Sequence, residues 1–466
     1  MKDLLERSKL PWIFISLYMV PVFLFGKNHR DDYARLVHNY YGWASEGRPL
    51  TELIIRALSF GGDVTSISPL SQILAIFFGG LSCSIVSKYV IKSKGTLASL
   101  GMMLIFTCPF FIQNILYKFD VLTMMLSILL CTLPFIFLEK YNYKILFISS
   151  LISGFLVLCT YQPTITLLFA LCFVVSLHKC RDAKKLFGII TGGAVSLVAY
   201  KLFIATAISG TYAATNSSVI DILAPDAASH LKRNFYDLYF YLSMVTDAVW
   251  FKCNILIILI SASAILYNIF KGNIRVSIML LSFISMLFSF FMFFILNRPI
   301  YSPRVFVGFS SILACIAIAP IILCKGRYIK SLMGLSIFIP IILNFSIMSS
   351  FLTSLESQYK SDTAILYSLF EDNKSLDSDK PIYIHGTSKR TSILEKSVKK
   401  YPIIGQLVYQ DMGWWMVDSF AEYEHPGINL RTINNLPKGE AKVMKKWNGM
   451  YQIINIDNKN IVVFKR

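Results

Sequence analysis

Charged residues are scarce in this sequence. They make up 15% of the 466 residues, whereas 55% are hydrophobic and the mean hydropathy is +0.58. A soluble protein of this length carries about 25% charged residues. The apolar residues gather in runs of roughly 16–24, about the length that crosses a bilayer. This pattern excludes an ordinary soluble fold and predicts a polytopic α-helical membrane protein.

Acidic residues are especially few, with 27 Asp and Glu against 45 Lys and Arg, which gives a net charge of +18. The excess positive charge lies mainly in alternate loops between the apolar runs. Cytoplasmic loops of membrane proteins carry such an excess, so we attribute the charge to topology and do not expect nucleic-acid binding. Eleven spans are predicted, at approximately 10–26, 68–91, 97–116, 121–138, 145–160, 164–178, 186–207, 250–270, 276–296, 305–324 and 331–350.

The basic loops set the predicted orientation. One set of alternate loops contains Lys2, Arg7, Lys9, Lys88, Lys92, Lys94, Lys140, Lys144, Lys179, Arg181, Lys184, Lys185, Lys271, Arg275, Lys325, Arg327 and Lys330. The opposite short turns hold only Lys118, Arg298 and Arg304. We therefore expect the N-terminus in the cytoplasm and the C-terminus outside.

Cysteine is absent from two of the predicted outside segments, 27–67 and 351–466, although the chain has nine cysteines in or near its apolar runs. This excludes disulfides within those segments. No pair of cysteines has metal-ligand spacing. The cysteines are most simply small apolar residues.

The polar segments divide the chain into two predicted domains. Residues 1–350 form the membrane domain, with outside loops 27–67 and 208–249, and residues 351–466 form a small α/β domain. Within this tail we expect helices at 356–369 and 392–400, a strand at 381–386, and a closing hairpin whose strands, 451–457 and 461–466, are joined through 458–460.

Two adjacent carboxylates, Asp31 and Asp32, follow the first predicted span. On a helix Asp31 can pair with Arg35, because residues four apart face each other. Asp32 would then be available to another partner. A carboxylate beside an apolar surface tends to have a raised pKa, which suits a general base. The alternative interpretation is a solvated helix start, since Asp favours the first turn.

The same loop predicts a helix on the membrane surface. In the stretch 47–50, GRPL, a glycine and Arg48 precede a proline at a predicted first helical position. The following residues place Leu50, Leu53, Ile54, Ala57 and Leu58 on one face and polar residues opposite. Such a helix lies at the level of the lipid headgroups, so Arg48 is a candidate phosphate ligand.

Further polar residues lie at the outer ends of spans. Asp120 follows Tyr117 and Lys118, and a carboxylate at this level is costly unless it faces a polar cavity; the alternative is a plain turn residue. Tyr161 and Gln162 precede a proline between two short apolar runs. Irregular backbone at that depth is tolerated where it lines a cavity.

Three cations complete the candidate site. Arg298 and Arg304 lie in the stretch NRPIYSPR, and Lys201 lies toward the outer end of the seventh span. Arg binds phosphate through two parallel hydrogen bonds. The alternative is that these side chains snorkel to the membrane interface.

Taken together, these motifs resemble the Gtr-type serotype-converting O-antigen glucosyltransferases. The resemblance rests on DDYARLVHNYYGWASEGRPL (31–50), NILYKFD (114–120), YQP (161–163) and the PR of 303–304. It implies a GT-C type glycosyltransferase of the bacterial inner membrane. The implied donor is undecaprenyl-phosphate glucose at the periplasmic face, and the implied acceptor is a hydroxyl of O-antigen, the polysaccharide of lipopolysaccharide.

The resemblance also implies roles for the candidate residues. An acidic residue in the first outer loop is catalytic in GT-C enzymes, and Asp31 and Asp32 occupy that loop. We expect Asp32 to be the base, with Asp31 and Arg35 orienting it, and Asp120 to help hold the acceptor or the base. Substrate-binding candidates are Arg48, Tyr117, Lys118, Tyr161, Gln162, Lys201, Arg298 and Arg304.

Other function classes remain open from the sequence. A polyprenyl-lipid or polysaccharide transporter would use the same arginines, although we find no paired interrupted repeats. An O-antigen polymerase would use a lipid-linked oligosaccharide. No cofactor is expected, and a divalent metal has no support in the sequence. The tail is expected to recognise the acceptor, with Trp414 and Trp415 suited to stacking on sugars or to packing in a core.

Overall fold

A computed structural model describes residues 2–93, 96–178, 182–208, 214–216, 218–221, 223–246, 248–324, 326–375, 381–413, 416–447 and 449–464. Trp414 and Trp415 therefore lie outside the described residues. The chain forms two compact units. The first comprises Met1–Leu24, Gly42–Gly62 and Ile67–Met348, and the second comprises Phe25–Tyr41, Asp63–Ser66 and Ser349–Arg466.

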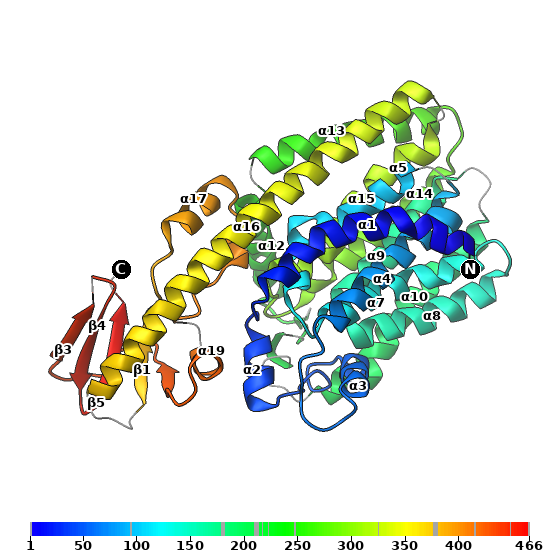
Figure 1. Cartoon of the computed structure of the whole chain (residues 1–466). Coiled ribbons are helices and arrows are strands. Elements are labelled where there is room, and N and C mark those ends of the chain that lie inside the picture. The colour runs from blue at the N-terminus through cyan, green and yellow to red at the C-terminus, as the bar shows by residue number, and fades with distance from the viewer. Residues whose placement is uncertain are drawn as a thin grey trace. The chain divides into compact units, whose positions relative to one another are not determined.

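The first unit is helical (Figure 1). Its elements are α1 (Lys2–Phe25), α3 (Pro49–Leu58), α4 (Leu70–Ile85), η1 (Val86–Ile91), α5 (Thr96–Thr107), η2 (Pro109–Phe111), α6 (Ile112–Leu116), α7 (Val121–Thr132), η3 (Leu133–Phe137), α8 (Tyr143–Thr160), η4 (Gln162–Thr164), α9 (Ile165–Ser176), α10 (Ala183–Phe203), η5 (Ala205–Ala207), α12 (Ala227–Val245), α13 (Ala248–Phe270), α14 (Val276–Phe291), η6 (Met292–Ile295), η7 (Pro303–Phe306), α15 (Val307–Leu323) and the first part of α16 (Arg327–Ser375).

Every predicted span coincides with helix. Among the described residues, seven helices are long and apolar enough to cross a membrane, or eight if Leu97–Thr107 and Pro109–Leu116, bent by 53°, form one span. Three more apolar helices, Val121–Phe137, Gln162–Ser176 and Val276–Phe291, are shorter. A multi-pass helical membrane protein is thus confirmed. The count of eleven spans and the GT-C architecture stay predictions.

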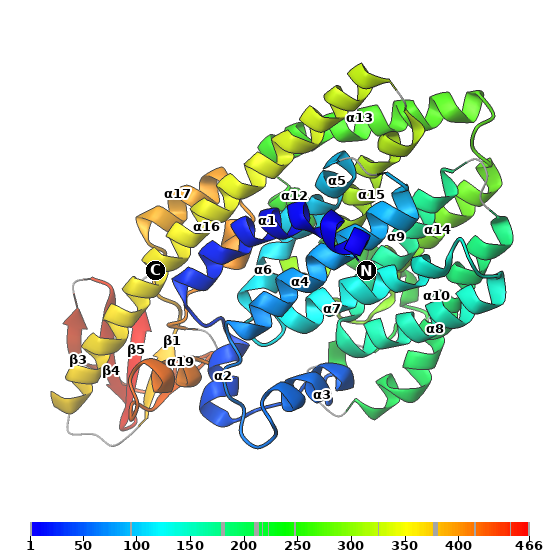
Figure 2. The same cartoon turned by 45° about the vertical axis from the view of Figure 1, so that its right-hand side comes forward.

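Close backbone approach holds the helices of the first unit together. Helices α8 and α10 run side by side (Figures 1 and 2). Gly192 of α10 makes this possible, because a Cβ there would lie 2.4 Å from the carbonyl oxygen of Phe147 on α8. Small residues at helix interfaces are typical of membrane proteins, where packing rather than the hydrophobic effect drives association.

Four of the segments that were predicted to share one side are in contact with one another in the first unit. Lys88 pairs with Asp3 over 2.8 Å, and Lys92 pairs with Glu139 over 2.6 Å. The Lys185 ammonium donates to the carbonyl of Leu138 over 3.0 Å. These contacts join the chain start, the loop after η1, the loop after η3 and the start of α10. Which side of a membrane these segments face stays a prediction.

The second unit contains a five-stranded mixed sheet. Its strands are β1 (Ile382–His385), β2 (Leu430–Thr432), β3 (Lys442–Trp447), β4 (Tyr451–Ile456) and β5 (Lys459–Phe464), in the order β2-β1-β5-β4-β3. Strand β1 is parallel to β2 and β5, and β4 is antiparallel to β3 and β5. Its helices are α2 (Asp31–His38), the end of α16, α17 (Ser392–Lys400), α18 (Ile404–Leu407) and α19 (Val417–Glu424).

The predicted tail elements are present. Helix 392–400, the strand within 381–386 and the closing hairpin are confirmed as α17, β1 and β4–β5. Asp457 and Asn458 form the hairpin turn with φ of 50° and 63°, in the left-handed region that Asn and Asp tolerate. The predicted helix 356–369 is confirmed as part of α16, a continuous helix of 49 residues that also contains the last predicted span. Strands β2 and β3 were not predicted.

One hydrophobic core ties α2 to this sheet. Tyr33 of α2 is buried with Leu366 and Leu369 of α16, Phe420 of α19 and Val462 of β5. The Tyr33 ring meets Phe420 edge-on, with centroids 5.5 Å apart. Burial of large aromatic rings dominates the energetics of small cores. The segment that carries Asp31 and Asp32 is therefore built into the unit that contains the tail.

Candidate functional site

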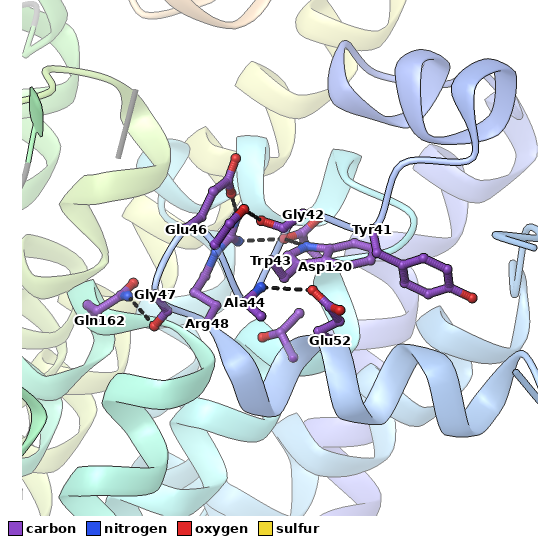
Figure 3. Close-up of polar contacts among 12 residues, drawn as sticks. Tyr41, Gly42, Trp43, Ala44, Glu46, Gly47, Arg48, Glu52, Asp120 and Gln162 are labelled. Carbon is purple, nitrogen blue, oxygen red and sulfur yellow. Dashed lines mark hydrogen bonds and ion pairs between the residues drawn. The ribbon is translucent and has the colours of Figure 1, made fainter. Parts of the chain in front are cut away.

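A buried ion pair lies at the N-terminus of α3. Arg48 donates through Nη1 to Oδ1 of Asp120 over 2.6 Å, and Trp43 donates its indole N–H to the same oxygen over 2.9 Å (Figure 3). The other terminal nitrogen of Arg48 pairs with Glu46. The Asp120 side chain is only 5% exposed and that of Arg48 14%. Asp120 thus neutralises a buried cation, which accounts for a carboxylate at this depth.

A glycine turn fixes the backbone directly before Arg48. Gly47 has φ of +80°, and its carbonyl accepts hydrogen bonds from Gln162 Nε2 (3.1 Å) and from the hydroxyl of Tyr200 (2.9 Å). Gln162 also donates to the Tyr200 hydroxyl over 2.9 Å. This clamp joins the loop before α3 to η4 and α10. It explains why irregular backbone occurs between α8 and α9, as the sequence predicted.

A cavity of about 510 Å³ lies beside this clamp. Its polar lining includes Glu46, Arg48, Tyr161, Gln162, Tyr200, Lys201, Asn216 and Arg304, and its apolar lining includes Leu158, Ile165, Leu197, Ile208, Val219, Phe290, Ile295, Leu296, Ile300 and Val305. Three cations and one carboxylate are thus found among its described lining residues. The cavity joins a cationic polar surface to apolar walls.

Arg304 is held in the cavity wall through its backbone. Its N–H donates to Gln113 Oε1 over 3.0 Å, and its carbonyl accepts from the Tyr161 hydroxyl over 2.6 Å. The guanidinium lies over the ring of Tyr117, 5.0 Å from the centroid. A cation within about 6 Å of a ring centroid is attracted to the face of the ring, so the Tyr117 ring helps to hold the Arg304 guanidinium.

The structure brings together five of the predicted binding residues, Arg48, Tyr161, Gln162, Lys201 and Arg304, in the cavity lining. Tyr117 and Asp120 do not line the cavity, but Tyr117 contacts Arg304 and Asp120 pairs with Arg48. Arg298 is exposed and does not line the cavity. Lys118 also lies outside the lining, and its carbonyl accepts from Ser71 over 2.7 Å. The functional roles of all these residues stay predictions.

The predicted catalytic pair belongs to the second unit. Asp32 is fully buried in the first turn of α2, and its Oδ2 accepts the backbone N–H of His29 over 3.3 Å. The solvated helix start considered from the sequence is therefore wrong for Asp32, because this carboxylate is buried and accepts a backbone N–H. Arg35 donates to the carbonyls of Tyr40 and Tyr41. Its predicted pairing with Asp31 stays a prediction.

A second pair of carboxylates lies in the same unit, with Asp362 fully buried and Asp411 partly buried. Asp362 accepts from Ser388 Oγ over 2.6 Å and from the backbone N–H of Asp411 over 2.8 Å. Burial, followed by the nearby charge of Asp362, raises the pKa of Asp411 to about 8. This cluster was not found from the sequence, because its members lie 49 positions apart.

Sequence reasoning also missed Trp43, Glu46, Gln113 and Tyr200. Glu46 and Trp43 lie in the same loop as Arg48, so the loop itself was the available signal. Tyr200 immediately precedes Lys201, and an aromatic residue in an apolar run carries no signal of its own. Within the described residues, no group of three or more His, Cys, Asp or Glu is arranged to hold a metal ion.

These features first define a class: a multi-pass helical membrane protein with a cavity that combines cations with apolar walls. The comparisons then define the family. The family described as Glucosyl transferase GtrII matches residues 22–315. Because this match covers more than half of the chain, the chain belongs to the GtrII family.

One curated relative adds context. The chain is 29% identical over 220 residues to a protein of Salmonella phage P22 described as an "Uncharacterized 55.3 kDa protein in gtrB 5'region". That match covers 45% of this chain and 45% of the relative. No solved structure matches the chain.

Proposed function

We propose that this protein transfers glucose from undecaprenyl phosphate to a hydroxyl of O-antigen. The observation that carries the proposal is the cavity, whose cations Arg48, Lys201 and Arg304 adjoin apolar walls. A sugar joined to a lipid phosphate has the matching chemistry, with an anionic group between a polar head and an apolar chain. Membership of the GtrII family supports a glucosyltransferase.

The cations support the departure of a phosphate. The leaving group is a lipid phosphate that is already charged, so it needs fixed positive groups more than it needs a proton. Arg48 is suited to this role because Asp120, Trp43 and the Gly47 turn hold it in place. Arg304 is fixed through its backbone and by the Tyr117 ring. Preorganised charge requires little reorganisation during reaction.

The proposed reaction is a single displacement. The acceptor hydroxyl oxygen attacks the anomeric carbon, and the bond from that carbon to the phosphate oxygen breaks with its electron pair. The hydroxyl proton passes to a carboxylate, for which we propose Asp32 from its place in the first outer loop. Attack from the opposite face inverts the anomeric carbon. Glu46 is the competing candidate, because it is the carboxylate among the described cavity-lining residues.

An enzyme assay tests the proposal against its rivals. Purified protein in nanodiscs is incubated with labelled undecaprenyl-phosphate glucose and O-antigen, and the label is followed into polysaccharide. A glucosyltransferase adds single glucose residues. A polymerase lengthens the O-antigen chain. A transporter transfers no glucose in this assay, but it moves labelled lipid across the bilayer when the protein is placed in liposomes. Either of these outcomes overturns the proposal.

We further propose that the protein lies in the bacterial inner membrane, with its N-terminus in the cytoplasm and residues 351–466 in the periplasm. The contacts among four segments of the predicted cytoplasmic set, which are the chain start, the loops after η1 and η3, and the start of α10, support this orientation. Alkaline phosphatase fused after the last residue should be active. A well-expressed but inactive fusion contradicts both the orientation and a periplasmic reaction.

The tail is proposed to select the acceptor. Exchanging 351–466 for the tail of a GtrII relative that modifies another O-antigen should change the acceptor and leave the donor unchanged. A changed donor with an unchanged acceptor contradicts this assignment. Because Tyr33 lies in the same core as the tail residues, the exchange should include residues 25–41 from the same relative.

A further inference from the structure

Helix α12 carries an unusual surface. Although residues 208–249 were predicted as an outside segment, Ala227–Val245 form a helix of 19 residues. One face is buried through Asn234, Leu238, Tyr241 and Val245. On the opposite side, Phe235, Tyr236, Tyr239 and Phe240 are 63%, 65%, 65% and 58% exposed. We call these four residues the outer face of α12.

The orientation of α12 is fixed, so the outer face cannot turn inward. Asn234 Nδ2 donates to the carbonyls of Phe294 (2.7 Å) and Leu296 (2.8 Å). The Tyr301 hydroxyl donates to the carbonyl of Asn234 over 2.7 Å. Tyr241 stacks on Phe306, with centroids 4.9 Å apart and planes inclined by 13°.

These contacts attach α12 to the wall of the cavity. Leu296 lines the cavity itself, and Phe306 lies two residues after Arg304 in η7. The bridge between Val219 and Leu296 extends the same wall. The helix therefore presents four aromatic rings to its surroundings while its other face braces the segment that carries Arg304.

We propose that the outer face of α12 lies in membrane lipid. A contiguous apolar patch of this kind is unusual on a water-exposed surface and marks an interaction site. Aromatic rings, and tyrosine in particular, favour the boundary between headgroups and acyl chains. Between Asn234 and Val245 the single charged residue is Asp237, which is half-buried, whereas Lys232 and Arg233 lie at the N-terminal end.

The outer face of α12 lies close in sequence to α13, and this supports lipid as its partner. Helix α13 begins at Ala248, three residues after α12 ends, and Val249–Phe270 is long and apolar enough to cross a membrane. Phe251, Ile255 and Ile258 of α13 are exposed at 50%, 37% and 40%. The outer face of α12 thus precedes a surface that lipid must cover. Lys, Arg and Tyr side chains are typical anchors of a helix at the membrane interface.

Photo-crosslinking in the full-length protein tests this inference. Tyr236 and Tyr239 are replaced singly by p-benzoylphenylalanine, which resembles them in size and reacts with C–H bonds on irradiation. The reference sites are Ile258 on α13 and the exposed Lys396 on α17. Each variant is purified in nanodiscs of one phospholipid, checked for monodispersity, and irradiated.

We expect positions 236 and 239 to gain the mass of one phospholipid in a yield similar to that of position 258, whereas position 396 gains none. The inference is overturned if position 258 reacts with lipid while positions 236 and 239 react as little as position 396. A crosslink to a second copy of the chain also overturns it, because the outer face would then be a protein interface. Phe240→p-benzoylphenylalanine replaces either variant that fails to fold. None of these outcomes depends on transferase activity.

Discussion

Arg48 donates to Oδ1 of Asp120 across 2.6 Å, although the two residues are 72 positions apart. Their side chains are 14% and 5% exposed, so each charge depends on the other for its burial. Removing one member of a buried pair typically costs about 3–5 kcal/mol, because the remaining charge loses its partner. The stability of the first unit therefore depends on keeping the two charges together, and the pair also fixes the direction of a cation in the cavity.

Breaking this pair should separate stability from donor binding. Arg48→Met should lower the unfolding temperature in detergent, because the Asp120 carboxylate stays buried. The double variant Arg48→Met/Asp120→Leu should recover most of that loss, since both charges are gone. Donor affinity should stay weak in both variants. A single variant as stable as the parent protein would contradict the burial argument.

Gly47 should tolerate substitution far less well than Gly61. Both have positive φ, +80° and +76°, where a Cβ costs roughly 1–2 kcal/mol. A Cβ at Gly61 meets open space, whereas a Cβ at Gly47 would lie 2.5 Å from the Tyr200 hydroxyl. Gly47→Ala should thus displace the clamp and reduce transfer well beyond the loss in Gly61→Ala. Equal transfer rates in the two variants would show that the clamp does not contribute to transfer.

Arg304 and Arg298 form a matched pair for testing the phosphate site. Arg304 lines the cavity, whereas Arg298 is exposed outside it. Arg304→Ala should weaken donor binding by about 1.5–3 kcal/mol, or roughly 10–150-fold in Kd, as expected for a lost charge-assisted hydrogen bond. Arg298→Ala should change it little. Titration of donor lipid into nanodisc-bound protein measures both, and a larger effect at Arg298 would move the phosphate site elsewhere.

The sequence predicts the membrane helices, part of the cavity lining and the last hairpin, because short patterns of apolar and polar residues determine them. Apolar runs gave the positions of the membrane helices, and polar residues near their ends and in the loop before α3 gave five side chains of the cavity lining. The hairpin of β4 and β5 follows from alternating apolar residues around Asp457 and Asn458. Each of these patterns extends over fewer than about 25 residues.

Long-range packing explains what the sequence could not predict. Tyr33 looks like any aromatic residue in a polar loop, yet it packs against Phe420, far along the chain. The change of composition near 350 suggested the end of a helix, but α16 continues through it. Leu366 and Leu369 in its later part are buried against the sheet of the second unit, so tertiary contacts sustain the helix beyond the apolar run.

Asp411 should make the second unit less stable as pH rises. Its pKa is raised to about 8 in the fold, from an ordinary value of 3.8. Between these values the unfolded chain has released the proton and the folded chain retains it, so stability falls from about pH 4 to about pH 8. Asp411→Asn should flatten this dependence and stabilise the unit most at pH 8. Protease resistance of the tail at pH 5.5 and pH 8 measures the effect, and an unchanged slope in the variant would assign it to other groups.

The base is tested by three isosteric substitutions. Asp32→Asn keeps an oxygen that can accept the N–H of His29 but removes the negative charge. If Asp32 takes the acceptor proton, turnover should fall by about two to four orders of magnitude while donor affinity stays unchanged. Asp31→Asn should cost less, because that carboxylate is proposed to orient and not to react. Glu46→Gln keeps an acceptor oxygen for Arg48 but removes the negative charge that pairs with it, so it should change donor affinity more than turnover.

The pattern across these variants decides the assignment. Transfer rate and donor affinity are measured for each, and gel filtration in detergent checks folding. A loss of turnover in Glu46→Gln with near-normal turnover in Asp32→Asn would assign the proton transfer to the cavity's own carboxylate. Near-normal turnover in all three would leave Asp32 with a structural role alone, as the side chain that accepts the His29 N–H at the start of α2.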